Sequence, residues 1–216
     1  MISVLDRDTL NLVQSGKVKV EVASSESLPN DDNSVHFVLS SPPYCTRIDY
    51  AVATFPELAI LGYSLESDFP QLRRVLIGTS TVSRSVCSPL SEWGSCCNNF
   101  LQAVGSHKSK ASKTYYYKNH VQYFDSIYKS LSEIQRVLAP KGCCVLVIQD
   151  SYYKDVYNNL PQVIVEMGES LNLYLNDRYD FSFERSMARI NPNTRIYRKG
   201  YGSTESVLCF VKKRGE

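Results

Sequence analysis

The sequence is poor in the features that mark metal-binding, secreted and membrane proteins. Only three histidines are present, and the seven cysteines include no C-x-x-C pair, so we expect no zinc site. No run of about 18 uncharged apolar residues occurs, which argues against a membrane span. The first residues lack the basic-then-apolar order of a secretory signal. We therefore expect a cytoplasmic protein whose thiols are reduced.

The composition is that of one globular domain, and its charge alone identifies no partner. Apolar residues make up 43% of the 216 residues and charged residues 21%, which suffices for one core with an insertion. The net charge of +2 is too small to indicate nucleic acid. Two stretches nevertheless carry basic residues without acidic ones. They are residues 107–120, with Lys108, Lys110, Lys113 and Lys118, and residues 185–199, with Arg189, Arg195 and Arg198. Each could follow a phosphate backbone or form a solvated basic surface.

Hydrophobic periodicity predicts strands and helices in alternation. The predicted strands cover residues 17–22, 35–39, 143–148, 179–183 and 206–211. The predicted helices cover residues 6–14, 52–61, 117–138 and 160–173. This order predicts an α/β protein with a mostly parallel sheet that is covered on both faces, its last two strands forming an antiparallel hairpin. Residues 64–112 are rich in Ser, Cys and Gly without a strong period, and we expect them to form an irregular insertion over the core.

The loop Ser41-Pro42-Pro43-Tyr44 directly follows the predicted strand at residues 35–39. In α/β sheets, ligands bind outside the carboxyl ends of the strands. The prolines fix φ and lack N–H donors, so the Ser41 hydroxyl and the Pro42 carbonyl are two acceptors suited to an amine. Tyr44 offers a flat face on which a planar ring can stack. The alternative is that the four residues form only a rigid surface turn.

The loop and its surroundings resemble the amino-group DNA methyltransferases, which act on adenine N6 or cytosine N4. In that family a polar segment with Leu-Pro, here residues 24–29, precedes a strand that ends in (Ser/Asp/Asn)-Pro-Pro-(Tyr/Phe/Trp). Ser at position 41 and the continuation over residues 46–58 resemble the cytosine-N4 branch, as in bacterial and phage modification methylases. The resemblance continues through residues 138–142 to the strand that begins near Glu205, and it is weakest over residues 64–112.

The resemblance implies a fold, an activity and a set of site residues. The fold would be the Rossmann-like sheet of S-adenosylmethionine-dependent methyltransferases, and the reaction would be methyl transfer to cytosine N4 in double-stranded DNA, within a restriction-modification system. Residues 64–112 would recognise the target sequence. The catalytic residues would be Ser41, Pro42, Pro43 and Tyr44; the cofactor contacts Ser24, Glu26, Ser40 and Ser41; and the DNA contacts Arg47, Lys108, Lys110, Lys113, Arg189, Arg195 and Arg198.

Four alternatives remain at the level of the sequence. One is an RNA or protein-glutamine substrate, which a Pro-Pro-Tyr loop permits but which no other feature of the sequence supports. Adenine-N6 transfer needs the same amine geometry, so Ser41 favours cytosine without deciding the base. Methylation at cytosine carbon-5 needs a nucleophilic thiol in a Pro-Cys pair, whereas here Cys45 follows Tyr44, which disfavours it. The chain could also be a non-catalytic DNA-binding remnant.

Two departures from the family concern the cofactor. Ser24 stands where the family usually has an acid, with Glu26 the nearest carboxylate, and no Gly-rich cofactor loop is present; residues 200–202 are a poor substitute. We therefore expect residues 1–216 to be the C-terminal part of one catalytic domain, with its first strands supplied by an upstream-encoded subunit. Such a chain would expose an apolar sheet edge and be poorly soluble or inactive alone.

Overall fold

The computed structural model describes residues 19–46, 48–183 and 203–213. The helix predicted for residues 6–14 lies outside these ranges. Four predicted DNA contacts also lie outside them: Arg47, Arg189, Arg195 and Arg198. Residues 19–22 fall in the strand predicted for residues 17–22 but form no strand, and Val20 and Val22 are fully exposed there. That prediction is wrong for the described residues, because an alternating pattern without a partner strand cannot form a ladder.

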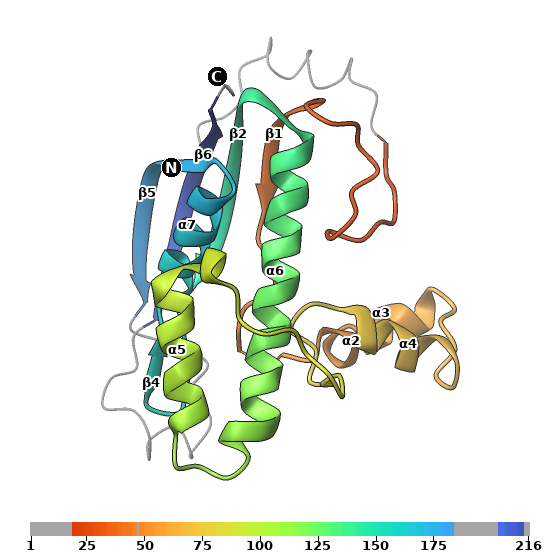
Figure 1. The fold of residues 1–216 in the computed structure, drawn as a ribbon. Coiled ribbons are helices and arrows are strands. Elements are labelled where there is room, and N and C mark those ends of the chain that lie inside the picture. The colour runs from red at the N-terminus through yellow and green to blue at the C-terminus, as the bar shows by residue number, and fades with distance from the viewer. Residues whose placement is uncertain (1–18, 47, 184–202, 214–216) are drawn as a thin grey trace.

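Four strands form the central sheet in the order β1-β2-β6-β5 (Figure 1). Their bounds are β1 Val35–Ser40, β2 Leu138–Gln149, β5 Leu173–Phe183 and β6 Ser203–Lys212. β1 pairs with β2 in parallel, whereas the β2–β6 and β6–β5 pairs are antiparallel. These four predicted strands are confirmed, and so is the antiparallel pairing of the last two. The prediction of a mostly parallel sheet is wrong for the described strands, since a continuous apolar run does not distinguish a parallel strand from a central antiparallel one.

Three helices cover one face of the sheet (Figure 1). α6 (Tyr117–Val137) and α7 (Leu160–Ser170) contact the strands, and α5 (Gly94–Ser106) packs on α6 and α7. The helices predicted at residues 117–138 and 160–173 are thus confirmed, and each ends slightly earlier than predicted. Burial alternates along β2 at its carboxyl-terminal half, so every second side chain of the strand enters the core.

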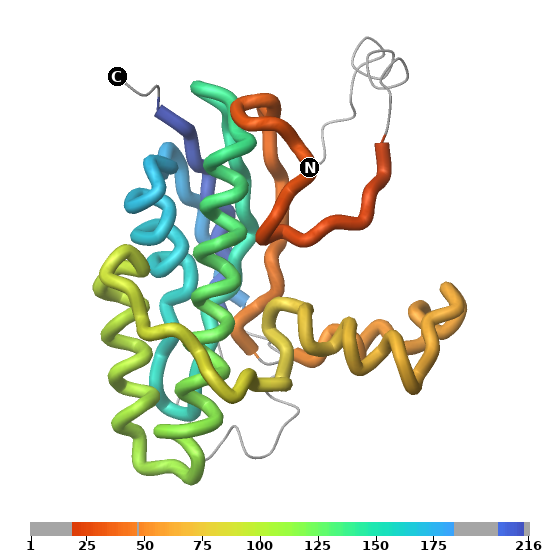
Figure 2. The backbone as a smooth tube through the Cα atoms, turned by 45° about the vertical axis from the view of Figure 1, so that its right-hand side comes forward, coloured from red at the N-terminus to blue at the C-terminus, as the bar shows by residue number. Residues whose placement is uncertain are grey.

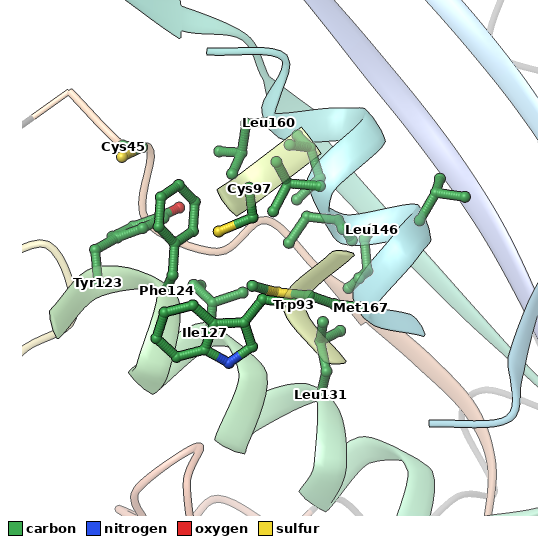
Figure 3. Close-up of a cluster of buried hydrophobic side chains, with 14 of the residues drawn as sticks. Cys45, Trp93, Cys97, Tyr123, Phe124, Ile127, Leu131, Leu146, Leu160 and Met167 are labelled. Atoms are coloured by element: carbon green, nitrogen blue, oxygen red, sulfur yellow. The ribbon is translucent and has the colours of Figure 1, made fainter. Parts of the chain in front are cut away.

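The core lies between these helices and the sheet. Trp93, Phe124 and Met167 are fully buried and come from three different elements (Figure 3). Cys45, which follows the Ser-Pro-Pro-Tyr loop, is also buried and belongs to the same cluster. The loop is therefore joined to the core through its next residue.

The opposite face of the sheet is apolar and is covered by no helix among the described residues. Phe37 and Leu39 of β1 are 57% and 66% exposed, and Tyr179 and Phe181 of β5 are 56% and 53% exposed. Within the described sheet, β1 has a hydrogen-bonded neighbour on one side alone. The expected exposed apolar edge is therefore confirmed, and the prediction of a sheet covered on both faces is wrong for this part of the chain.

The segment between β1 and α6 contains more helix than predicted. The helix predicted at residues 52–61 is two short helices, α2 (Tyr50–Ala53) and α3 (Phe55–Ile60). They are divided at Thr54, because Pro56 in the first turn of α3 has no N–H to bond back to the preceding turn. α4 (Asp68–Val75) follows, and α2, α3 and α4 project sideways from the sheet in both views (Figure 2). The prediction that residues 64–112 are irregular is wrong for α5, which is a core helix.

Shorter elements complete the described fold. The 3₁₀ turn η1 (Ser91–Trp93) precedes α5, and the π-helical turn η2 (Ser112–Tyr116) precedes α6. β3 (Ser151–Tyr153) and β4 (Val156–Asn158) form a hairpin directly after β2. In the part of the chain that the structure describes, no helix has the length and apolar character required to span a membrane.

Candidate active site

The Ser-Pro-Pro-Tyr loop begins where β1 ends. Ser40 pairs with Leu146 of β2, and the hydroxyl of Ser41 donates a hydrogen bond of 3.3 Å to the carbonyl oxygen of Val147. The loop thus starts at the carboxyl end of a parallel strand pair, the edge of an α/β sheet where ligands bind. Because the Ser41 proton is directed to Val147, the lone pairs of this exposed hydroxyl face away from that bond and can accept hydrogens from a ligand.

Two tyrosine hydroxyls hold the loop on its inner side. Tyr123 of α6 donates to the carbonyl oxygen of Pro43 at 2.7 Å, and the backbone N–H of Tyr44 donates to the hydroxyl of Tyr50 at 3.1 Å. The carbonyl of Pro43 is therefore engaged from the core, next to the Pro42 carbonyl that was predicted as an acceptor. The sequence pattern did not point to Tyr123, because it lies 80 residues from the loop.

Tyr44 is half-buried, and its side chain links the loop after β1 to strand β6. Its hydroxyl donates a hydrogen bond of 2.8 Å to the Oε1 atom of Glu205 in β6, although β2 lies between β1 and β6. Burial raises the pKa of Tyr44, and the hydrogen bond to Glu205 raises it further, so the phenol remains protonated at neutral pH. Glu205 was not predicted as a site residue, since nothing near it in the sequence indicates the contact.

A brace next to the loop involves Asp49. Its carboxylate accepts hydrogen bonds from Arg73 of α4 and from the Ser80 hydroxyl, and it also caps α2 at Val52 N. Burial alone would raise the pKa of Asp49, but the hydrogen bonds from Arg73 and Ser80 outweigh it and lower the pKa. Asp49 therefore braces α2 against α4 through its ion pair with Arg73.

The polar segment before β1 lies along α6. Ser25 and Ser130 share a hydrogen bond of 2.9 Å, and the N–H of Leu28 donates to Glu133 at 2.8 Å. Arg136 donates to the carbonyl oxygens of Leu28 and Asn30, at 2.9 and 3.0 Å. These contacts fix the segment that holds two of the predicted cofactor residues.

The structure brings only some of the predicted cofactor residues together. A cavity of about 160 Å³ is lined by Ser25, Ser40, Ser41 and Pro42, with apolar side chains of α6 and β2 behind them. Ser24 and Glu26 instead line a separate groove of about 830 Å³ with residues 74–87. Ser25, which was not predicted, is the residue of this turn that faces the loop.

An aromatic pocket of about 200 Å³ lies on the other side of the loop. Cys45 and Thr46 line it with residues of η2, α6 and the β3–β4 hairpin: Tyr116, His120, Tyr152, Tyr153 and Lys154. The Tyr153 hydroxyl lies 2.6 Å from that of Ser112, which ties the hairpin to η2. Tyr152 and Tyr153, which follow β2 at its carboxyl end, thus lie beside the loop.

The predicted lysine contacts lie next to this pocket. Lys108, Lys110 and Lys113 are exposed in the connection from α5 to α6. His107 Nε2 lies 2.8 Å from the Oδ1 atom of Asp155, so this connection is attached to the turn of the β3–β4 hairpin. The three side chains therefore share the end of the molecule that holds the aromatic pocket.

Solved structures similar to this chain include those of one bacterial protein. They are three structures of a candidate DNA modification methylase, TTHA0409 of Thermus thermophilus: a native form, a selenomethionine derivative, and a complex with S-adenosyl-L-methionine. Identity is 14% in each case, and the TM-scores are 0.43, 0.40 and 0.40. They cover 90%, 89% and 87% of this chain, and 54%, 52% and 52% of their own. The chain thus spans about half the length of these proteins.

Sequence comparisons add a family assignment. A comparison with curated proteins gave no match. The family model N6_N4_Mtase, described as DNA methylase, matches residues 35–216. This range contains the Ser-Pro-Pro-Tyr loop and the whole described sheet, and it is well over half of the chain. The chain belongs to the DNA methylase family N6_N4_Mtase.

Proposed function

We propose that this chain carries the catalytic loop of a DNA methyltransferase that moves a methyl group from S-adenosylmethionine to the N4 amine of cytosine. The observation that carries the proposal is the position of Ser41 to Tyr44 at the carboxyl end of β1, in a chain of the DNA methylase family. Ser at position 41, rather than Asp or Asn, favours cytosine over adenine. The reaction needs orientation of a weakly basic amine more than it needs a strong base.

The proposed role of the loop is to hold the amine and its ring. Two oxygens accept hydrogen bonds from the two N–H groups of the amine: the Ser41 hydroxyl, whose own proton is directed to Val147, and the Pro42 carbonyl. These hydrogen bonds let the nitrogen become more tetrahedral. The nitrogen lone pair would form the bond to the methyl carbon while the methyl–sulfur bond breaks and its electron pair stays on the departing neutral thioether, and the amine would release one proton to solvent. Tyr44 supplies a face on which the extruded base recovers stacking of about 1–3 kcal/mol.

The methyl donor would lie beside Ser40 and Ser41. When bound, S-adenosylmethionine supplies an electrophilic methyl group on a sulfonium. The hydroxyls of Ser25, Ser40 and Ser41 fit its polar groups, but their cavity of about 160 Å³ is smaller than the roughly 300–1,000 Å³ of common ligand pockets. These residues would therefore hold part of the cofactor. The remainder of its site would be completed by an element packed along the exposed edge of β1, on the same chain or on a partner.

The substrate would be double-stranded DNA with the target base extruded. The aromatic pocket beside Cys45 and Thr46 lies next to the loop and is also lined by Lys154, and the exposed lysines at positions 108, 110 and 113 lie in the connection that leads to Tyr116 of this pocket. This arrangement supports two roles: the lysines would contact the DNA phosphate backbone, and the extruded base would bind between these lysines and Tyr44. The region proposed for target recognition narrows from residues 64–112 to residues 64–87, which include α4, because α5 belongs to the core.

Nucleoside mass spectrometry tests the proposal. DNA would be taken from a methylation-free host that expresses the chain, alone and together with the coding sequence upstream of it. N4-methylcytosine in either culture, and its loss in a Tyr44→Ala variant that still folds, would support the proposal. N6-methyladenine would overturn the choice of base. The absence of both would favour a non-catalytic DNA-binding subunit.

A further inference from the structure

The hydrogen bond between Tyr44 and Glu205 joins the loop to a strand that is not its neighbour in the sheet. We propose that Glu205 is a positioning residue, which holds the Tyr44 ring in the orientation required for stacking on the target base. This proposal rests on the proposed function, because Glu205 would affect methyl transfer through its effect on Tyr44.

Glu205 lies on a rigid support. β6 is paired on both sides, with Glu205 opposite Gln149 of β2 and Phe181 of β5. A paired interior strand does not shift to accommodate a side chain, so the carboxylate provides a fixed acceptor. Functional geometry is held best by groups on such elements.

A second carboxylate fixes the backbone next to Glu205. The N–H of Thr204 donates to Asp150 Oδ1 at 3.0 Å, and the N–H of Asp150 donates to the carbonyl oxygen of Thr204 at 3.0 Å. The hydroxyl of Tyr157 donates to the other oxygen of Asp150 at 3.2 Å. This reciprocal pair closes the end of the β2–β6 ladder. Glu205 therefore cannot move away from Tyr44 by fraying of the strand.

Tyr44 is consequently held at both ends. Its backbone N–H is bonded to the Tyr50 hydroxyl, and its phenol oxygen is bonded to Glu205. The ring retains little rotational freedom, so a base arriving from the duplex meets a surface that is already oriented. Loss of the acceptor would release the ring from its bond to β6 and would leave Ser41 as the remaining polar neighbour of the phenol.

Two substitutions of Glu205 separate its role as a hydrogen-bond acceptor from a role of its charge. Glu205→Gln keeps an amide oxygen that can accept the Tyr44 proton, whereas Glu205→Ala removes the acceptor. Tyr44→Phe keeps the stacking face and removes the donor. Glu169→Ala, an exposed carboxylate at the end of α7, serves as the matched control.

Single-turnover methyl transfer at saturating DNA is the first measurement. We expect Glu205→Ala and Tyr44→Phe each to lower the rate by about 10- to 100-fold, with the KM for S-adenosylmethionine within about twofold of the parent. The double variant should be no slower than either single one, because both remove the same bond. Glu205→Gln and Glu169→Ala should stay within about threefold. A normal rate in Glu205→Ala, or a rate in Glu205→Gln as low as in Glu205→Ala, would overturn the proposal.

Fluorine NMR of the chain labelled with 3-fluorotyrosine gives a readout that does not depend on methyl transfer. The Tyr44 signal is assigned by its absence in Tyr44→Phe. We expect it to shift and to average between orientations in Glu205→Ala and to stay near its parental position in Glu205→Gln. An unchanged signal in Glu205→Ala overturns the positioning role even if the chain methylates DNA. A changed signal supports that role even if the base proves to be adenine or no transfer is found.

Discussion

The hydroxyl of Tyr123 donates a hydrogen bond of 2.7 Å to the carbonyl oxygen of Pro43, so the catalytic loop candidate is tied to the second turn of α6. Tyr123 is only 4% exposed, and burial raises its pKa well above the ordinary value, so its phenol is a neutral donor. The bond sets the direction of the peptide between Pro43 and Tyr44. The geometry of the loop thus depends on a core residue that meets neither cofactor nor DNA in the proposed arrangement.

Removal of this bond should cost both stability and activity. Tyr123→Phe keeps the ring in the core but leaves the Pro43 carbonyl without its donor. We expect the free energy of unfolding to fall by about 1–2 kcal/mol, and methyl transfer to fall more than stability explains because the loop loosens. Tyr128→Phe, on the same helix and half-buried, is the control for loss of a phenol. Urea unfolding and transfer assays on both variants check this; equal effects of the two substitutions would contradict it.

The attachment of the segment before β1 should depend on pH through Glu133. Hydrogen bonds from Arg136 and from Leu28 N lower the pKa of Glu133 to about 2. Because this pKa lies below the value in an unfolded chain, about 4.3, the ionised carboxylate stabilises the fold at neutral pH. That contribution is lost progressively as pH falls from about 5 to about 2.

Thermal unfolding across this pH range measures the effect. Glu133→Gln should lower the melting temperature by about 2–4 °C at pH 7, and the difference from the parent should shrink towards zero near pH 2. The exposed Glu169 offers a control, since Glu169→Gln should show no such convergence. A difference between Glu133→Gln and the parent that is constant with pH would rule out this role of Glu133.

The elements with strong local signals were predictable from the sequence. β1 and the loop after it could be placed because an apolar strand leads directly into two prolines. α6 could be placed because its apolar residues recur at helical spacing over many turns. α5 was missed although Cys97, Phe100, Leu101 and Val104 have the same spacing, because two Asn residues between them and the Gly and Ser residues at both ends of the helix are poor helix formers. Tertiary packing outweighs that propensity: the Glu166 carboxylate caps α5 by accepting from Cys96 N at 2.9 Å.

The parts of the candidate site that depend on long-range contacts could not be predicted. Tyr44 and Glu205 are separated by 161 residues, and Pro43 and Tyr123 by 80. No local pattern encodes such a contact, since it arises from the order of strands in the sheet and from the packing of α6. The turn at Ser24 shows the same limit, because Ser25 rather than Ser24 faces the loop once the turn lies on α6.

A pair of glycines separates backbone strain from crowding at the start of α5. Gly94 and Gly62 have almost the same positive φ, 83° and 81°. A Cβ atom at Gly94 would lie 2.2 Å from the Oε2 atom of Glu166, whereas at Gly62 no atom lies within 4 Å. Gly62→Ala should therefore cost only the left-handed strain of about 1–2 kcal/mol. Gly94→Ala should cost about 3 kcal/mol or more, because it also displaces the cap of α5. Chemical denaturation of both variants measures the free energies of unfolding. Equal losses in Gly62→Ala and Gly94→Ala would show that the Glu166 side chain moves aside without cost.

The exposed face of the sheet should make the chain associate when it is expressed alone. Leu39 is 66% exposed on this face, while Val38, the preceding residue of β1, packs towards the core. Neighbouring residues of a strand point to opposite faces, so one polar substitution at each position tests the two faces separately. Leu39→Thr should reduce aggregation, measured by light scattering and size-exclusion chromatography, with the free energy of unfolding changed by less than about 0.5 kcal/mol. Val38→Thr should instead lower that free energy by about 1–2 kcal/mol without reducing aggregation, because it buries a hydroxyl. If both variants aggregate as the parent does, this face is not the surface through which the chain associates.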